Sequence, residues 1–174
     1  MVCYHALSDW LAVLVSGCSF GVLLCVNLMF TPSILKIRDV ATRVEQWQNL
    51  YHYGFYYAMR FTALFLILVV PGLLTDFDFL KFLAVLFTVA KVFFTFKVMM
   101  PTNTTLLNNS LRAEDRAPLI TKWISMHNVR ILTEFLAFAL YAWTVVNAGA
   151  AHGHSHGHDH GHHHHHDHDH HHHH

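Results

Sequence analysis

The sequence predicts an all-α fold, an integral membrane four-helix bundle followed by a disordered His-rich C-terminal tail. The chain is 53% hydrophobic and only 13% charged, whereas soluble domains are about a quarter charged. Apolar residues gather in four segments, residues 11–30, 57–74, 79–100 and 129–146. Each approaches the ~20 residues needed to cross a hydrocarbon core about 30 Å thick. Because lipid offers no hydrogen bonds to the backbone, these segments are expected to be helices that pack as a small bundle.

The first apolar segment is expected to remain as a spanning helix, since residues 1–10 lack the Lys or Arg with which a signal peptide begins. Polar connections are predicted at residues 31–55, 75–78 and 101–127. Positive charges concentrate in the first and third of them, at Lys36, Arg38, Arg43, Arg112, Arg116 and Lys122. Positive loops stay in the cytosol, so both termini of this multi-pass protein are predicted to be non-cytosolic. No sorting motif distinguishes the endoplasmic reticulum from the plasma membrane.

The tail, residues 151–174, is a separate segment from the predicted membrane domain, residues 1–150. It contains almost only His, Gly and Asp, so it cannot bury a core and is expected to be disordered. Imidazole is a common ligand of Zn²⁺, Ni²⁺ and Cu²⁺. The predicted metal ligands are His152, His154, His156, His158, His160 and His162. A purification tag would also explain the final His run, but the interspersed Gly, Ser and Asp favour a native tract.

One predicted helical face carries polar and aromatic side chains into the fourth apolar segment. Trp123, His127, Arg130 and Glu134 are spaced at i, i+4, i+7 and i+11, which places them on one side of a helix. Charged residues inside a membrane are costly unless they are paired or face a wet cavity, so they indicate a functional site. The alternative is a structural ion pair that orients the bundle.

The third apolar segment contains Lys91, about 13 Å from its C-terminal end at 1.5 Å per residue. Glu134 is expected at a similar depth from the same side of the membrane, and it is the only acidic residue within the four segments. The two are therefore candidate partners, although Arg130 can also pair with Glu134 directly at i, i+4. Lys91 and Glu134 are both expected to contribute to the substrate site.

A second helical face precedes the second apolar segment. His52, Tyr56 and Arg60 are spaced four residues apart, and we expect them to bind substrate at the cytosolic mouth. The neighbouring tyrosines 51, 53 and 57 are instead typical of an interfacial aromatic belt. One acid among the cations Arg60, Lys91 and Arg130 leaves positive charge that a bound anion or an ionised phenol would neutralise.

Three short motifs resemble those of a known protein family. They are MMPTN at residues 99–103, W-x-x-x-H-x-x-R at 123–130 and LYHYG at 50–54. Over about residues 8–147 the chain resembles the anthrone oxygenase-like family of small four-helix membrane proteins, which includes fungal enzymes of aromatic polyketide pathways. The resemblance implies oxidation of an anthrone to an anthraquinone by O₂, with no metal or flavin. It extends to the matching positions Pro101, Asn103, Trp123, His127 and Arg130.

The resemblance and the chemistry together suggest a role for each matched side chain. His127, with an unperturbed pKa of ~6.5, suits a general base. Arg130 and Asn103 would stabilise the enolate oxygen, and Trp123 would stack on the substrate ring. Structural alternatives remain for three of them: His127 as a loop cap, Trp123 as an interface anchor and Asn103 as a turn or helix initiator.

The function predicted from these observations is a cofactor-independent membrane oxygenase acting on a small, enolisable aromatic substrate. The alternatives are a membrane protein that binds transition metal ions through its tail, and a non-catalytic scaffold. Cation transport is disfavoured, since the apolar segments contain no His and no cluster of carboxylates. The expected partners are the lipid bilayer, the substrate and metal ions; with a net charge of +0, no nucleic acid is expected. The sequence does not determine the substrate or the oligomeric state.

Overall fold

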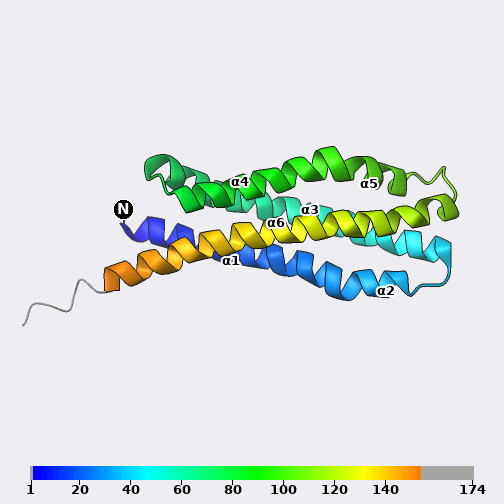
Figure 1. Ribbon diagram of the computed structural model, residues 1–174, viewed down its shortest axis with the longest axis horizontal. Helices are drawn as coiled ribbons and strands as arrows, with labels where there is room; N and C mark the ends of the chain where they lie inside the picture. Colours follow the sequence, from blue (N-terminus) through cyan, green and yellow to red (C-terminus); the bar gives the residue numbers. More distant parts are fainter. Residues whose placement is uncertain (1, 154–174) are drawn as a thin grey trace, which may run out of the picture.

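The computed structural model describes the backbone of residues 2–153 and the side chains of residues 6–148. Within these ranges the chain is helical, and it forms two hairpins that lie side by side in one elongated bundle (Figure 1). The first hairpin consists of α1 (Val2–Cys25), η1 (Val26–Phe30), α2 (Thr31–Leu35) and α3 (Val40–Thr75). The second consists of α4 (Phe79–Phe94), η2 (Thr95–Met99), α5 (Met100–Leu107) and α6 (Ala113–Gly153).

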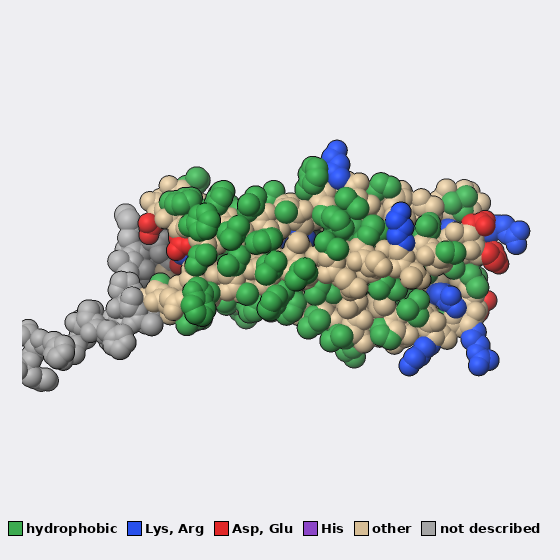
Figure 2. Space-filling view, viewed as in Figure 1, with side chains coloured by type: hydrophobic (Ala, Val, Ile, Leu, Met, Phe, Trp, Pro, Cys, Tyr) green, Lys and Arg blue, Asp and Glu red, His purple; other side chains and the backbone are tan. Residues whose placement is uncertain are grey.

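Four helical stretches are long and apolar enough to cross a membrane, as the sequence predicted. They are Ala6–Leu35, Val40–Thr75, Phe79–Leu107 and Ala113–Ala148. On the face shown in Figure 2, hydrophobic side chains extend over much of the length of the bundle, while most Lys and Arg side chains gather toward one end. These are the properties of a multi-pass membrane protein.

The two ends of the bundle differ in charge. We call the end with the turns at residues 36–39 and 108–112 the basic end, and the end with the turn at residues 76–78 the acidic end. Ion pairing at the acidic end joins Lys81 of α4 to Asp9 of α1 at 2.7 Å. The Asp78 side chain also caps α4 there by accepting a hydrogen bond from the Lys81 amide at 2.9 Å.

The polar connections predicted at residues 31–55 and 101–127 are wrong in their extent, because most of their residues are helical. The α3 helix begins just after Asp39, whose side chain accepts a hydrogen bond from the Thr42 amide at 2.8 Å. The α6 helix begins with Glu114 and Asp115 in its first turn, where negative charges stabilise a helix by their favourable interaction with its dipole. At 1.5 Å per residue, α3 is about 54 Å long, so it extends well beyond a hydrocarbon core.

A π-helical turn precedes a proline in each of the two interrupted helices. The Thr31 amide bonds to the Val26 carbonyl just before Pro32, and the Met100 amide bonds to the Thr95 carbonyl just before Pro101. Proline has no N–H and its ring crowds the carbonyl four residues earlier, and a π-turn changes the hydrogen-bond register at such a point. Both π-turns lie toward the basic end (Figure 1).

Two apolar clusters form the core, one toward each end. The cluster toward the basic end consists of Val26, Val44, Trp47, Met99, Leu106, Ile120 and Trp123. The one toward the acidic end consists of Ala12, Phe65, Val69, Ala84, Tyr141 and Val145. Three buried charged side chains, Lys91, Arg130 and Glu134, lie on the helices between the two clusters, and they belong to the candidate site.

Candidate functional site

The predicted polar face of α6 turns into the bundle. Trp123, His127, Arg130 and Glu134 are all buried, with exposed fractions of 4%, 2%, 8% and 4%. Their spacing along the helix therefore does what the sequence indicated: it directs one aromatic ring, one imidazole and two charged groups toward the other helices.

Lys91 of α4 and Glu134 of α6 form a buried ion pair, as predicted. The Lys91 ammonium also donates to the Thr62 hydroxyl of α3 at 3.0 Å, so the pair joins three helices. Its hydrogen bonds satisfy the charge that burial would otherwise penalise. The pair lies beyond the cavity described below and does not line it.

The Arg130 guanidinium has no such partner. Among the described residues no carboxylate lies within 4.0 Å of it, and its Nε makes no hydrogen bond. Lys91, Arg130 and Glu134 together carry two positive charges and one negative charge. This part of the interior therefore has an excess positive charge, which favours an anionic ligand.

The imidazole of His127 is held in a defined orientation. Its Nε2 lies 3.2 Å from the Leu23 carbonyl oxygen of α1, and because a carbonyl only accepts, Nε2 must donate. In the neutral ring, Nδ1 then carries the free lone pair, and Nδ1 has no hydrogen-bond partner among the described residues. The Trp123 ring stacks on the imidazole at 4.8 Å between centroids. The result is a fixed, buried base with an available nitrogen.

A cavity of about 30 Å³ lies between α1, α3 and α6, and His127, Arg130 and Trp123 form its α6 wall. A buried water needs roughly 10–15 Å³, whereas pockets for drug-sized ligands are about 300–1,000 Å³. The cavity thus has room for about two or three water molecules, and a tricyclic ligand would have to displace side chains at its edge.

Tyr51 belongs to this site, although its position in the sequence suggested an interfacial belt. It lines the cavity and stacks on Trp47 at 5.2 Å. Trp47 in turn meets Trp123 edge to face at 5.6 Å. The sequence signal that identifies Tyr51 is a repeated spacing, W-x-x-x-Y at residues 47–51 and W-x-x-x-H at residues 123–127. The α3 helix contributes the stacked pair Trp47 and Tyr51, and α6 contributes the stacked pair Trp123 and His127.

Asn103 of α5 is buried, and its Oδ1 has no hydrogen-bond partner among the described residues. It does not line the cavity. Tyr51, which does line it, directs its hydroxyl to the sulfur of Met100, 3.9 Å away, at the start of the helix that carries Asn103. Trp123 lines the cavity with one face covered by His127 and its ring against Trp47, so it forms a wall rather than an open stacking surface.

The structure does not bring His52, Tyr56 and Arg60 to the site. They share one face of α3, as their spacing requires, but that face is exposed. The His52 ring packs against the rings of Tyr53 and Tyr56 at 5.3 and 5.4 Å. The inward face of α3 is instead the one that carries Trp47 and Tyr51, because these rings pack against α6.

No group of three or more potential metal ligands occurs among the described side chains. The six histidines predicted to bind metal, His152 to His162, lie outside the described side chains. The tail prediction therefore stays a prediction.

A protein-family model described as anthrone oxygenase matches residues 47–140. The matched region is more than half of the chain, and it extends from Trp47 through Lys91 and Asn103 to Glu134. No curated protein and no solved structure matches the chain. The chain belongs to the anthrone oxygenase family, and the resemblance noted from its motifs is confirmed.

Proposed function

We propose that this member of the anthrone oxygenase family oxidises an enolisable, anthrone-like aromatic substrate with O₂ at the cavity beside His127. The proposal rests on the orientation and hydrogen bonding of the His127 imidazole. The Leu23 carbonyl fixes Nε2, and Nδ1 is unpartnered within the described chain in a ring that lines the cavity. A positioned base of this kind is what removal of a carbon-bound proton requires.

In the first step, Nδ1 of His127 takes a proton from the benzylic CH₂ group of the substrate. The electron pair of the broken C–H bond moves onto the ring carbonyl oxygen and leaves an enolate. Arg130 supports this step, since a buried guanidinium without a carboxylate within 4.0 Å in the described structure stabilises a developing oxyanion. Tyr51, which lines the same cavity, offers a phenolic donor, since its hydroxyl makes only a 3.9 Å contact with the Met100 sulfur.

In the second step, the enolate carbon transfers an electron to O₂, and the resulting radical pair combines into a C–O bond. His127 returns its proton to the peroxide oxygen, so the intermediate is a hydroperoxide. Removal of the second benzylic proton then breaks the O–O bond and releases water. The net change converts CH₂ and O₂ into C=O and H₂O, which balances four electrons. The proposal assigns no metal and no flavin to these steps.

The membrane orientation belongs to the same proposal. Lys36, Arg38, Arg43, Arg112, Arg116 and Lys122 belong to the basic half of the bundle, which supports a cytosolic location for the basic end by the positive-inside rule. The site would then lie on the cytosolic side, and both termini on the opposite side, of the endoplasmic reticulum or plasma membrane.

The test is turnover of an anthrone by protein in lipid nanodiscs, measured as O₂ consumption and as ¹⁸O incorporation from ¹⁸O₂ into the new carbonyl. His127→Ala should reduce turnover by about 10²- to 10⁴-fold, the usual contribution of general base catalysis. Asn128→Ala is the matched control, because Asn128 is the next residue of α6 and is exposed. Empty nanodiscs measure spontaneous oxidation. Turnover by His127→Ala at the parental rate, with a parental thermal melt, would contradict the assignment of His127 as the base.

A further inference from the structure

We propose that the cavity opens sideways into the membrane between α1 and α3, and that Gly54 selects flat, phenolic polycyclic aromatic ligands at this opening. The inference deepens the proposed function, on which it rests for the chemistry inside the site.

The walls of the cavity differ in exposure. The three residues that α6 contributes, Trp123, His127 and Arg130, are all buried. Val22 of α1 is 37% exposed, and Gly54 and Phe55 of α3 are half-buried. The cavity is therefore closed by α6 and reaches the surface along the contact between α1 and α3.

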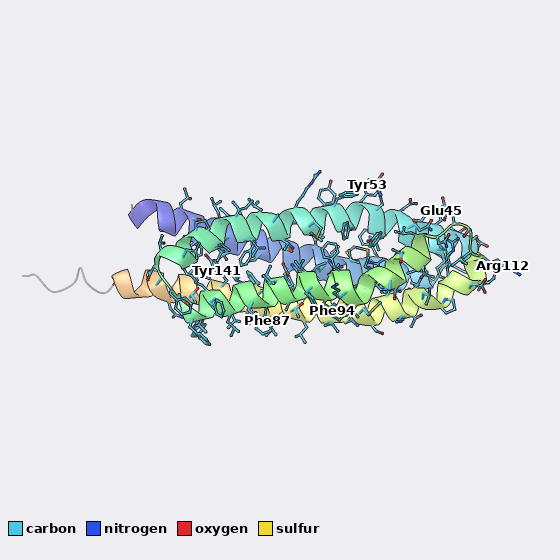
Figure 3. The ribbon with its side chains drawn as sticks, turned by 90° about the horizontal axis from the view of Figure 1, so that it is seen from above. Glu45, Tyr53, Phe87, Phe94, Arg112 and Tyr141 are labelled. Carbon is cyan, nitrogen blue, oxygen red and sulfur yellow. The ribbon has the colours of Figure 1, made fainter. Side chains whose placement is uncertain are left out.

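The opening lies at the height of an aromatic belt. Tyr53, Tyr56 and Tyr57 are exposed within one helical turn of Gly54, and Tyr53 points away from the bundle (Figure 3). Exposed tyrosines mark the boundary between lipid headgroups and hydrocarbon. A polycyclic aromatic with phenolic hydroxyls has one apolar and one polar part, so it accumulates at the same depth.

Gly54 leaves space at this opening. A Cβ atom added at Gly54 would meet no heavy atom within 4 Å, so close packing does not require glycine there. At Gly17, by contrast, an added Cβ would lie 3.2 Å from the Phe138 ring. Glycine inside a helix is less stable than alanine. Gly21 and Gly72 have the same open space but do not line the cavity, so of these three glycines Gly54 is the one at which a side chain would narrow the opening.

The chemistry inside the cavity defines the ligand class. Leu23, Val26 and Phe55 provide apolar walls for a ring system. Arg130 provides a buried positive charge without a carboxylate within 4.0 Å among the described residues. A planar aromatic whose leading edge carries an ionisable oxygen matches both features, because its rings bury apolar surface while its oxygen anion pairs with the guanidinium.

The test uses 1,8-dihydroxyanthraquinone as a non-reacting probe of this shape. Binding to protein in nanodiscs is followed by quenching of tryptophan fluorescence, with empty nanodiscs subtracted. Gly54→Leu should weaken binding by about ten-fold or more, because the side chain fills space that the ligand needs. Gly54→Ala should have an intermediate effect. Gly72→Leu is the matched control, since Gly72 is on the same helix, meets nothing within 4 Å at an added Cβ and does not line the cavity.

Parental binding by Gly72→Leu, with loss in Gly54→Leu at an unchanged melting temperature, is the expected result. The proposed opening beside Gly54 is contradicted if the parent does not bind the probe, if Gly54→Leu binds like the parent, or if both leucine variants lose binding equally. Oxygen consumption separates the two proposals. If the parent binds the probe but oxidises no anthrone, only the proposed oxygenase activity is contradicted. If Gly54→Leu retains the parental kcat/KM for an anthrone, only the proposed opening beside Gly54 is contradicted.

Discussion

The polar groups that lie between the helices at the two ends of the bundle differ in how well they are satisfied. At the acidic end, the Tyr141 hydroxyl donates to the Asp9 carboxylate at 2.6 Å, and the Lys81 ammonium pairs with the same carboxylate at 2.7 Å. Lys81 also lies over the Tyr141 ring, 5.7 Å from its centroid. Three helices are joined by a cluster in which each group has a partner, and Tyr141 lies between the helices (Figure 3).

Toward the basic end, buried polar atoms lack hydrogen-bond partners among the described residues. They are Trp47 Nε1, Asn103 Oδ1, Arg116 Nε, Trp123 Nε1, His127 Nδ1 and Arg130 Nε. Leaving a buried donor or acceptor unsatisfied costs about 1–3 kcal/mol. The acidic end therefore holds the helices together. Toward the basic end, Trp123, His127 and Arg130 line the cavity with unsatisfied groups that a ligand can satisfy.

The largest expected effect concerns the ion pair that lies between these two regions. Glu134→Gln leaves the Lys91 ammonium and the Arg130 guanidinium buried without an anion, so it should destabilise the bundle by about 3–5 kcal/mol. A thermal melt in detergent measures the loss. The double variant Lys91→Met with Glu134→Leu should recover much of it, because the Lys91 ammonium is removed together with its partner. If Glu134→Gln melts like the parent, the pair does not stabilise the bundle.

The second prediction separates stability from function at Arg130. Replacing it with methionine removes an unpaired buried charge, so Arg130→Met should melt at or above the parental temperature. Turnover should nevertheless fall by about 10²- to 10³-fold, because the enolate loses its cation. Arg130→Lys keeps the charge without the planar fork and should fall between the two. Parental turnover in Arg130→Met would show that the excess positive charge has no catalytic role.

The smallest effect is expected at the acidic end. Tyr141→Phe removes the donor to Asp9 and should lower stability by about 1–3 kcal/mol, with kcat and KM near parental values in the surviving folded protein. Asp9→Asn, which also breaks the ion pair with Lys81, should behave in the same way. The measurements are a thermal melt and oxygen consumption at a temperature well below the melt. A loss of turnover by Tyr141→Phe without a loss of stability would contradict a purely structural role for the acidic end.

Much of the architecture was accessible from the sequence because the membrane limits the choices. Apolar length predicted the four spans, and a helical period of 3.6 residues placed Trp123, His127, Arg130 and Glu134 on one face. Equal depth from one side of the membrane predicted that Lys91 and Glu134 would pair. In each case the property depends on position along a single helix or on a distance across the bilayer.

The rotation of each helix about its own axis is decided only by tertiary packing. The stretch WQNLYHYGFYYAMR, residues 47–60, has aromatic residues on every side, so its periodicity does not identify an inward face. Contact between the rings of Trp47 and Trp123 turns Tyr51 inward and His52, Tyr56 and Arg60 outward. The cluster of Asp9, Lys81 and Tyr141 likewise joins three helices whose registers the local sequence does not specify. A sequence pattern defines the faces of a helix, and the neighbouring helices select the face that is buried.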